Sequence, residues 1–127
     1  MSFDIINPEP LGRPSGWNHG MLGPAAGRVL FVAGQTAAQA GGLVEQWDAV
    51  LDRVLAVVRA AGGAPQDIGR MTVYVTNRAD YIATRTALGE VHRRHMGKHY
   101  PAMALVEVSA LVDSGALVEI EATAVIP

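Results

Sequence analysis

Hydrophobic positions along the 127-residue chain change their period several times, and each period predicts a different element. From Leu43 onward, apolar side chains recur every three or four residues, a stripe typical of a helix that ends at Gly62-Gly63. A second and less apolar helical pattern covers 81–96, with Asp80 as its expected cap. We therefore expect two amphipathic helices.

Five shorter segments have the alternation or the composition of strands, namely 3–7, 28–36, 70–76, 103–111 and 116–126. The segment 28–36 is dense in β-branched and aromatic residues, so it predicts a strand buried on both faces. Within it, Gly34 either ends the strand or lets another group approach its backbone. The turn composition from Val112 onward predicts that the last two strands form an antiparallel hairpin.

The resulting order, β-β-α-β-α-β-β, predicts an α+β fold in which two helices cover one face of a single sheet. One domain accounts for residues 1–127. The strands remain rich in apolar side chains on both sides, and a monomer would expose the face without helices. We therefore expect a homo-oligomer that packs through its sheets.

Composition narrows the function classes. Ten basic against twelve acidic residues give a net charge of -2, which provides no general attraction for nucleic-acid phosphates or anionic lipids. The chain contains no cysteine, so it has no disulfide, thiolate nucleophile or cysteine metal site. The N-terminal residues lack the charge and apolar stretch of a signal peptide, and no apolar run reaches the roughly 20 residues of a membrane span. We expect a cytoplasmic protein.

His92, His95 and His99 have the spacing of one helical face, which zinc ligands could use. The alternative is a solvated cationic helix end, because Gly97 interrupts the helix and the run 93–98 adds positive charge. We predict no bound metal. The same basic run could contact RNA phosphates, but no aromatic side chains for base stacking are interleaved with it. A nucleic-acid partner is therefore not expected.

Two further groups could carry chemistry. Glu119 and Glu121 are two apart in a strand, so they point to one face, where one of them could transfer protons; a solvated sheet edge is the alternative. Trp17 and His19 lie in a Pro/Gly-rich loop, where they either contact a ligand or anchor the loop. Glycine-rich phosphate loops, serine-hydrolase elbows and metalloprotease helices are missing from the sequence.

Several segments together resemble the reactive-intermediate deaminase family, RidA or YjgF. They are Gly16-Trp-Asn-His-Gly, Val32-Ala-Gly-Gln-Thr, the helix ending in Ala60-Ala-Gly-Gly, Thr72-Val-Tyr-Val-Thr, Tyr100-Pro-Ala, Val106-Glu-Val and Val118-Glu-Ile-Glu-Ala. The resemblance implies a homotrimer of chorismate-mutase-like subunits, whose sheets enclose a central barrel and whose ligand clefts lie between neighbours. It also implies hydrolysis of imines or enamines such as 2-aminoacrylate and 2-iminobutanoate without a cofactor.

At the site, the resemblance assigns Glu119 to orient the hydrolytic water. The chain departs from the family at three positions: Met103 stands where an arginine clamps the substrate carboxylate, Trp17 replaces a tyrosine, and Arg85 replaces an asparagine. The thioether of Met103 cannot form a bidentate charged contact, so the cation of the family site is missing there. Arg85 is the one candidate to replace it. The expected site thus consists of Glu119 as the catalytic residue and, as ligand-binding residues, Trp17, His19, Gly34, Arg85, Met103 and Leu105.

Three functions remain open from the sequence. The first is a divergent imine or enamine deaminase or hydrolase that acts on a less acidic metabolite. The second is a non-catalytic module that binds or senses a metabolite in the same cleft. The third is an RNA-directed protein of the ribonuclease or translation-inhibitor type, which the family resemblance also implies.

Overall fold

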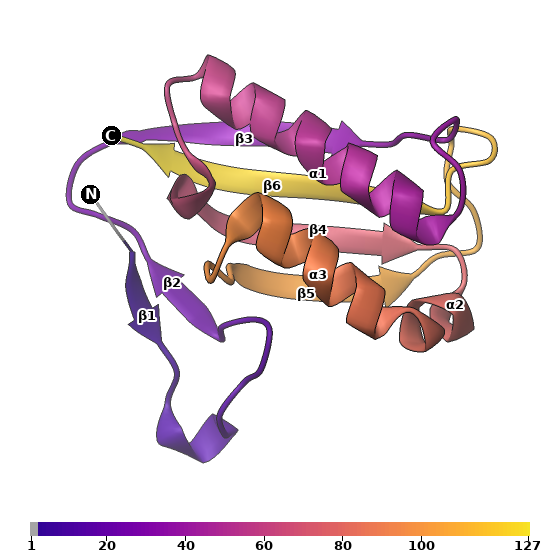
Figure 1. Ribbon diagram of the computed structural model, residues 1–127. Coiled ribbons are helices and arrows are strands. Elements are labelled where there is room, and N and C mark those ends of the chain that lie inside the picture. The colour runs from indigo at the N-terminus through magenta and orange to yellow at the C-terminus, as the bar shows by residue number, and fades with distance from the viewer. Residues whose placement is uncertain (1–2) are drawn as a thin grey trace.

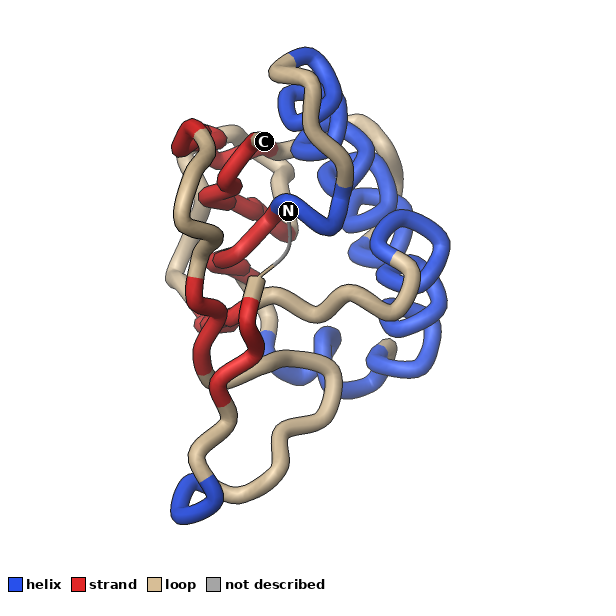
Figure 2. The backbone as a smooth tube through the Cα atoms, turned by 90° about the vertical axis from the view of Figure 1, so that its left-hand side faces the viewer, coloured by secondary structure: helices blue, strands red, loops and turns tan. Residues whose placement is uncertain are grey.

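The computed structural model describes residues 3–127 and places strands and helices in two layers (Figures 1 and 2). The four-stranded sheet has the order β3-β6-β4-β5. Its strands are β3 (Arg28–Gln35), β6 (Val118–Ile126), β4 (Ile68–Val75) and β5 (Ala102–Glu107). Helices α1 (Leu43–Ala60) and α3 (Arg85–Met96) cover one face of this sheet, which confirms the predicted α+β class.

Helix α1 matches its predicted range. Its apolar stripe is buried from Leu43 to Val58, so the periodicity marks the side that faces the sheet. The helix ends after Ala60, where Gly62 adopts a φ of 88° and the Gly63 amide donates to the Val58 carbonyl at 2.9 Å. This left-handed conformation favours glycine, and it closes the helix as the sequence predicted.

The second helical segment is divided into two helices. Helix α2 (Arg78–Ala83) ends at Thr84, and α3 begins directly afterwards. The predicted cap was wrong, because the side chain of Asn77 accepts a hydrogen bond from the Asp80 amide at 3.0 Å. Asp80 thus lies in the first turn of α2.

Strands β4 and β6 separate apolar from polar side chains by simple alternation. Met71, Val73 and Val75 on β4 face the helices and are buried, as are alternate residues of β6 from Val118 to Ile126. The opposite residues of both strands are only half-buried or exposed. Glu119 and Glu121 therefore share one face, as predicted, and it is the face without helices.

The predicted hairpin of the last two strands was wrong. Strand β5 pairs only with β4, in parallel, while β6 pairs antiparallel with both β3 and β4. A parallel pair needs a crossover connection, which α2 and α3 supply between β4 and β5. The segment 108–117 carries the chain past β4 instead of making a tight turn.

The expectation that 28–36 is buried on both faces was also wrong for a single chain. Val29 and Phe31 lie on the uncovered face of β3 and are 57% and 79% exposed. Elsewhere this face is more polar than expected, because Thr72 and Tyr74 from β4 lie beside the two glutamates of β6. Its exposed apolar side chains are thus concentrated on the edge strand β3.

The N-terminal part forms a separate two-stranded sheet of β1 (Asp4–Ile6) and β2 (Gly20–Leu22). The first strand was predicted, whereas three residues of β2 were too few to give a pattern. A short 3-10 helix, η1 (Glu9–Leu11), lies at the far end of this arm, which extends away from the two main layers (Figure 1).

Gln46 is a fully buried polar residue of α1 that joins the helix to two loops. Its amide nitrogen donates to the Gly41 and Gly115 carbonyls at 3.0 and 3.2 Å, and its oxygen accepts from the Leu117 amide at 2.8 Å. These bonds satisfy backbone groups in the loop before α1 and in the segment just before β6. The central strand thus enters the sheet from an anchored position.

Replacing Gln46 should therefore destabilise the protein. The substitution Gln46→Met keeps the approximate volume but leaves the Leu117 amide and two carbonyls without a partner, and we expect a loss of about 2–4 kcal/mol in the free energy of unfolding. Chemical denaturation at one fixed protein concentration measures it. The exposed Gln66→Met is the matched control and should change stability by less than about 0.5 kcal/mol. Equal stability of the two variants would contradict this role.

Candidate functional site

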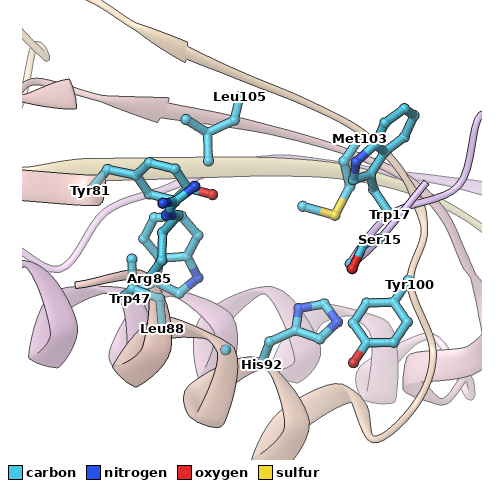
Figure 3. Close-up of a pocket in the computed structure, with 12 residues that line it drawn as sticks. Ser15, Trp17, Trp47, Tyr81, Arg85, Leu88, His92, Tyr100, Met103 and Leu105 are labelled. Carbon is cyan, nitrogen blue, oxygen red and sulfur yellow. The ribbon is translucent and has the colours of Figure 1, made fainter. Parts of the chain in front are cut away.

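A cavity of about 610 Å³ lies on the helical side of the sheet, between β5, α3 and the loop that precedes β2 (Figure 3). Its volume is typical of pockets that hold small organic molecules. The lining residues come from five parts of the chain and are Ser15, Gly16, Trp17, Trp47, Tyr81, Arg85, Leu88, Gly89, His92, Tyr100, Met103 and Leu105.

Helix α3 forms one wall. Arg85, Gly89 and His92 follow one another at spacings of four and three residues, so they lie on the same helical face. The helix accepts Gly89 in its interior despite the cost to helix stability. A Cβ at this position would meet only the guanidinium of Arg93, at 3.7 Å. The missing side chain therefore widens the cavity.

Strand β5 forms the opposite wall. Met103 and Leu105 are paired in parallel register with Met71 and Val73 of β4, so they point to the helical face of the sheet. As an edge strand, β5 leaves both side chains only half-buried. The thioether of Met103 points into the cavity (Figure 3).

The loop with Trp17 is tied to the beginning of β5 through Asn18. The Asn18 backbone amide donates to the Pro101 carbonyl at 3.2 Å, and its side-chain amide donates to the Tyr100 carbonyl at 2.6 Å. The side chain of Asn7 adds a third bond, to the Asn18 oxygen, at 2.8 Å. These contacts hold Trp17 over the same end of the cavity as Tyr100 (Figure 3).

Two aromatic pairs line the cavity. Trp47 of α1 stacks on Tyr81 of α2 with ring centroids 5.9 Å apart, near the Arg85 end. His92 and Tyr100 stack at 4.9 Å with rings almost parallel, near the Trp17 end. Burial lowers the pKa of His92, so its ring is neutral at neutral pH, and its Nε2 contacts the His99 carbonyl at 2.9 Å.

The cavity carries a single permanent charge. Among the described residues that line it, none is acidic and Arg85 is the only permanent cation. Arg85 also forms no ion pair with any other residue of 3–127. An otherwise apolar and aromatic cavity with one free guanidinium favours a ligand with one negative charge.

Glu119 and Gly34 form a second group, on the opposite face of the sheet. The ladder between β3 and β6 is interrupted between Val32 and Gln35, so Ala33 and Gly34 form a bulge. A Cβ on Gly34 would collide with the Glu119 carboxylate. The predicted close approach at Gly34 is thus confirmed, and the approaching group is Glu119.

The neighbouring Glu121 accepts a hydrogen bond from the Tyr74 hydroxyl at 2.5 Å. This bond to the carboxylate raises the pKa of Tyr74, so the phenol keeps its proton. Of the two glutamates, Glu121 is thereby engaged within the chain. In 3–127, Glu119 has no comparable side-chain hydrogen bond, which leaves its carboxylate available.

The predicted site residues therefore fall into two places. Trp17, Arg85, Met103 and Leu105 line the cavity, and His19 packs edge-to-face on Trp17 with centroids 4.5 Å apart. Glu119 and Gly34 lie across the sheet from them, because Glu119 pairs with Tyr74 whereas Met103 pairs with Met71 on the other alternation. One copy of the chain does not bring the two groups together.

The three histidine rings do not converge on one point where a metal ion could bind, because each ring contacts a partner of its own. His95 contacts Asp48 at 2.5 Å, His99 contacts the Ile68 carbonyl at 2.7 Å, and His92 faces the cavity. The hydrogen bond from His95 lowers the pKa of Asp48, which also pairs with Arg94 at 3.3 Å. Part of the basic run therefore links α3 to α1. Within residues 3–127, no cluster of three His, Cys, Asp or Glu side chains could hold a metal ion.

Several lining residues were not predicted as site residues. Trp47 and Tyr81 have the spacing of core positions, and His92 belongs to the histidine run, so their patterns indicated other roles. The sequence signal that could have found His92 is the face it shares with Arg85 and Gly89, since glycine is unfavourable inside a helix.

Comparisons with known proteins agree with this fold. A family model described as Endoribonuclease L-PSP matches residues 12–126. The chain belongs to the RidA/YjgF family. A RutC family protein of Pyrococcus horikoshii is 34% identical over 106 residues, which cover 78% of this chain and 80% of the relative.

Two solved structures extend the RidA/YjgF similarity to the fold. A Rid-family protein of unknown function from Yersinia pestis has a TM-score of 0.83 and 34% identity, covering 99% of this chain and all of the other. A member of the YjgF/YER057c/UK114 family from Mycobacterium tuberculosis has a TM-score of 0.67 and 33% identity over 87% of each chain. The predicted family is thus confirmed. Among residues 3–127, no helix has the length and apolar character to cross a membrane.

Asn18 generates a prediction about the loop. Replacing it by alanine removes two side-chain hydrogen bonds, so we expect amide hydrogen exchange in residues 13–19 to accelerate about tenfold, the scale of one or two such bonds. Asn18→Asp is the informative control, because it keeps an acceptor for Asn7 and loses the donor to the Tyr100 carbonyl. Unchanged exchange in both variants would mean that the loop is held by other contacts.

Proposed function

We propose that this RidA/YjgF protein binds a small metabolite in a cleft completed by a second copy and hydrolyses an imine or enamine there. The observation that carries the proposal is the position of Glu119 against the backbone bulge at Gly34. Bulges place backbone groups and side chains out of the regular ladder, and they are common next to active sites. The carboxylate is thereby positioned beside polar backbone groups.

The second copy is needed because of the sheet geometry. Met103 and Glu119 lie on opposite faces, so a ligand that touches both groups must lie between two chains. The exposed Val29 and Phe31 on the uncovered face supply apolar surface that a neighbour would cover. Both points support an assembly of copies, and the homotrimer that the family resemblance implies would provide one.

The chemistry assigned to Glu119 is proton transfer. Water adds to the iminium carbon, and its proton passes to the Glu119 carboxylate, which gives a carbinolamine and a protonated glutamic acid. The proton then moves from Glu119 to the nitrogen. As the C–N bond breaks, the hydroxyl proton of the carbinolamine passes to the Glu119 carboxylate, and ammonia leaves as a carbonyl compound forms. The departing ammonia takes this proton from Glu119 and regenerates the carboxylate. An iminium carbon is already electrophilic, so a positioned water and one carboxylate are sufficient.

At Met103, the cavity differs from one that binds small imino acids. Its thioether supplies no charge, so Arg85 is the cation we assign to an anionic group of the ligand. A non-catalytic binding module would use the same cavity. The two functions differ in one measurable respect: both bind, but only the enzyme releases ammonia.

Assembly provides the first test. We expect light scattering to give a trimer across a wide concentration range. Phe31→Asp should shift the population to monomers, because it would bury a carboxylate in the contact between sheets. A charge at Val75 would not test the interface, because Val75 lies in the core under the helices. The control is Val112→Asp, since Val112 is fully exposed in a loop. A monomeric wild-type protein would refute the shared cleft.

Turnover provides the second test. If the chain is a RidA scaffold that lacks only its carboxylate clamp, Met103→Arg should raise ammonia release from 2-aminoacrylate or 2-iminobutanoate by about tenfold or more, the scale of one charge-assisted contact. Adding Glu119→Gln should abolish that gain while the trimer stays intact. Glu121→Gln is the matched control and should retain most of it.

Two results would count against this account. Wild-type protein that already hydrolyses these acidic imines as fast as Met103→Arg would show that the arginine position is irrelevant. Turnover that survives Glu119→Gln would remove the proposed proton-transfer residue. Ligand binding without ammonia release from any imine would leave the non-catalytic module as the function.

A further inference from the structure

We propose that the cavity selects an elongated anion, with a carboxylate at Arg85 and an aromatic or similarly planar apolar body at the end lined by Trp17 and Met103. This inference rests on the proposed function in placing the ligand in the same cavity, and it names the ligand class. Its basis is the arrangement of the walls in Figure 3: Arg85, the only permanent charge among the lining residues, lies at one end, and Trp17 and Met103 lie at the other.

The length of the cavity follows from α3. Arg85 and His92 are seven residues apart on one helical face, which corresponds to roughly 10 Å along the axis. A three- or four-carbon imino acid is too short to reach both ends. A ligand that contacts the guanidinium and the His92–Tyr100 pair must therefore carry a longer apolar body.

The apolar end is built from flat and polarisable groups. His92 and Tyr100 present stacked rings, Trp17 lies across from them, and the Met103 sulfur points between them (Figure 3). Aromatic faces and thioethers pack well against planar rings. The ring of His92 is neutral because burial lowers its pKa, so this end adds no charge.

Arg85 lies at the junction of two helices. It is the first residue of α3 and directly follows the end of α2 at Thr84, so the dipoles of the two helices oppose each other at this position. No acidic partner within residues 3–127 compensates it. A bound carboxylate would supply the negative partner that this guanidinium lacks.

Gly89 keeps the space between the two ends open. It lies between Arg85 and His92 on the cavity side, and only the Arg93 guanidinium is near its missing side chain. Alanine would form a better helix at this position, so glycine has a cost that stability does not explain. The open wall allows the body of a ligand to pass along the helix.

Calorimetric titration with three probes tests the proposal on the full-length protein. We expect 4-phenylbutanoate to bind at least about tenfold more tightly than butanoate, which lacks the ring, and than 4-phenylbutanamide, which lacks the charge. Equal affinities for the three probes, or no binding of 4-phenylbutanoate at millimolar concentration, would overturn the inference.

Variants test which residues of the cavity contact the carboxylate and which leave room for the body of the ligand. Arg85→Gln should reduce the preference for the carboxylate over the amide to near one without lowering the unliganded melting temperature. The exposed Arg59→Gln, which removes the same charge from α1, should keep the preference. Gly89→Leu should fill the cavity beside α3 and weaken the binding of 4-phenylbutanoate by about tenfold or more. Gly89→Ala should raise the melting temperature. A preference that survives Arg85→Gln would contradict the assignment.

The outcome is independent of turnover. Binding with the predicted selectivity but without ammonia release would leave the ligand class intact and remove the hydrolase function. Hydrolysis of small acidic imines without 4-phenylbutanoate binding would leave the hydrolase function intact and remove the proposed ligand class.

Discussion

The alternation of side chains along the central strand β6 is the constraint on which the rest of the molecule depends. Its apolar residues from Val118 to Ile126 face the helices and are buried, so Glu119 and Glu121 must point to the other face. A slip of one residue would place both carboxylates in the apolar core, at a cost of several kcal/mol. The core therefore determines where the candidate catalytic carboxylate lies.

This constraint separates the two halves of the site. The cavity with Arg85 and Met103 belongs to the helical face, and Glu119 at the Gly34 bulge belongs to the other. A cleft between copies is the simplest arrangement that unites them. Under the proposed function, the same separation would allow the ligand-binding wall to change, as at Met103, while the carboxylate stays in place. A family scaffold could then bind a different ligand without rebuilding its core.

The sequence predicted those parts of the fold that one period dominates. Helix α1 and strand β4 have clear stripes: the apolar side of α1 is buried as predicted, and β4 separates an apolar from a polar side as predicted. The hairpin prediction failed because local turn composition does not show which strand lies between two others, and here β4 separates β5 from β6. The break at Thr84 went unnoticed because α2 and α3 continue nearly the same periodicity.

For the site, prediction depended on the family resemblance, which named Trp17, Arg85, Met103 and Leu105 from three distant segments. Their meeting in one cavity could not be derived from spacing, because it depends on the parallel pairing of β5 and on the anchor at Asn18. The aromatic pairs were missed because core and cavity aromatics have the same helical spacing. Three-dimensional neighbours decide between these roles.

Crosslinking between engineered cysteines tests the shared cleft most directly, because the chain has no cysteine of its own. A Met103→Cys, Glu119→Cys double variant carries its two thiols on opposite faces of the sheet, where a short bismaleimide reagent joins them only between different copies. We predict covalent dimers and trimers on a denaturing gel, and far fewer with either single variant. Double-variant protein that stays monomeric on the gel, with both thiols modified, would contradict a site formed by two chains.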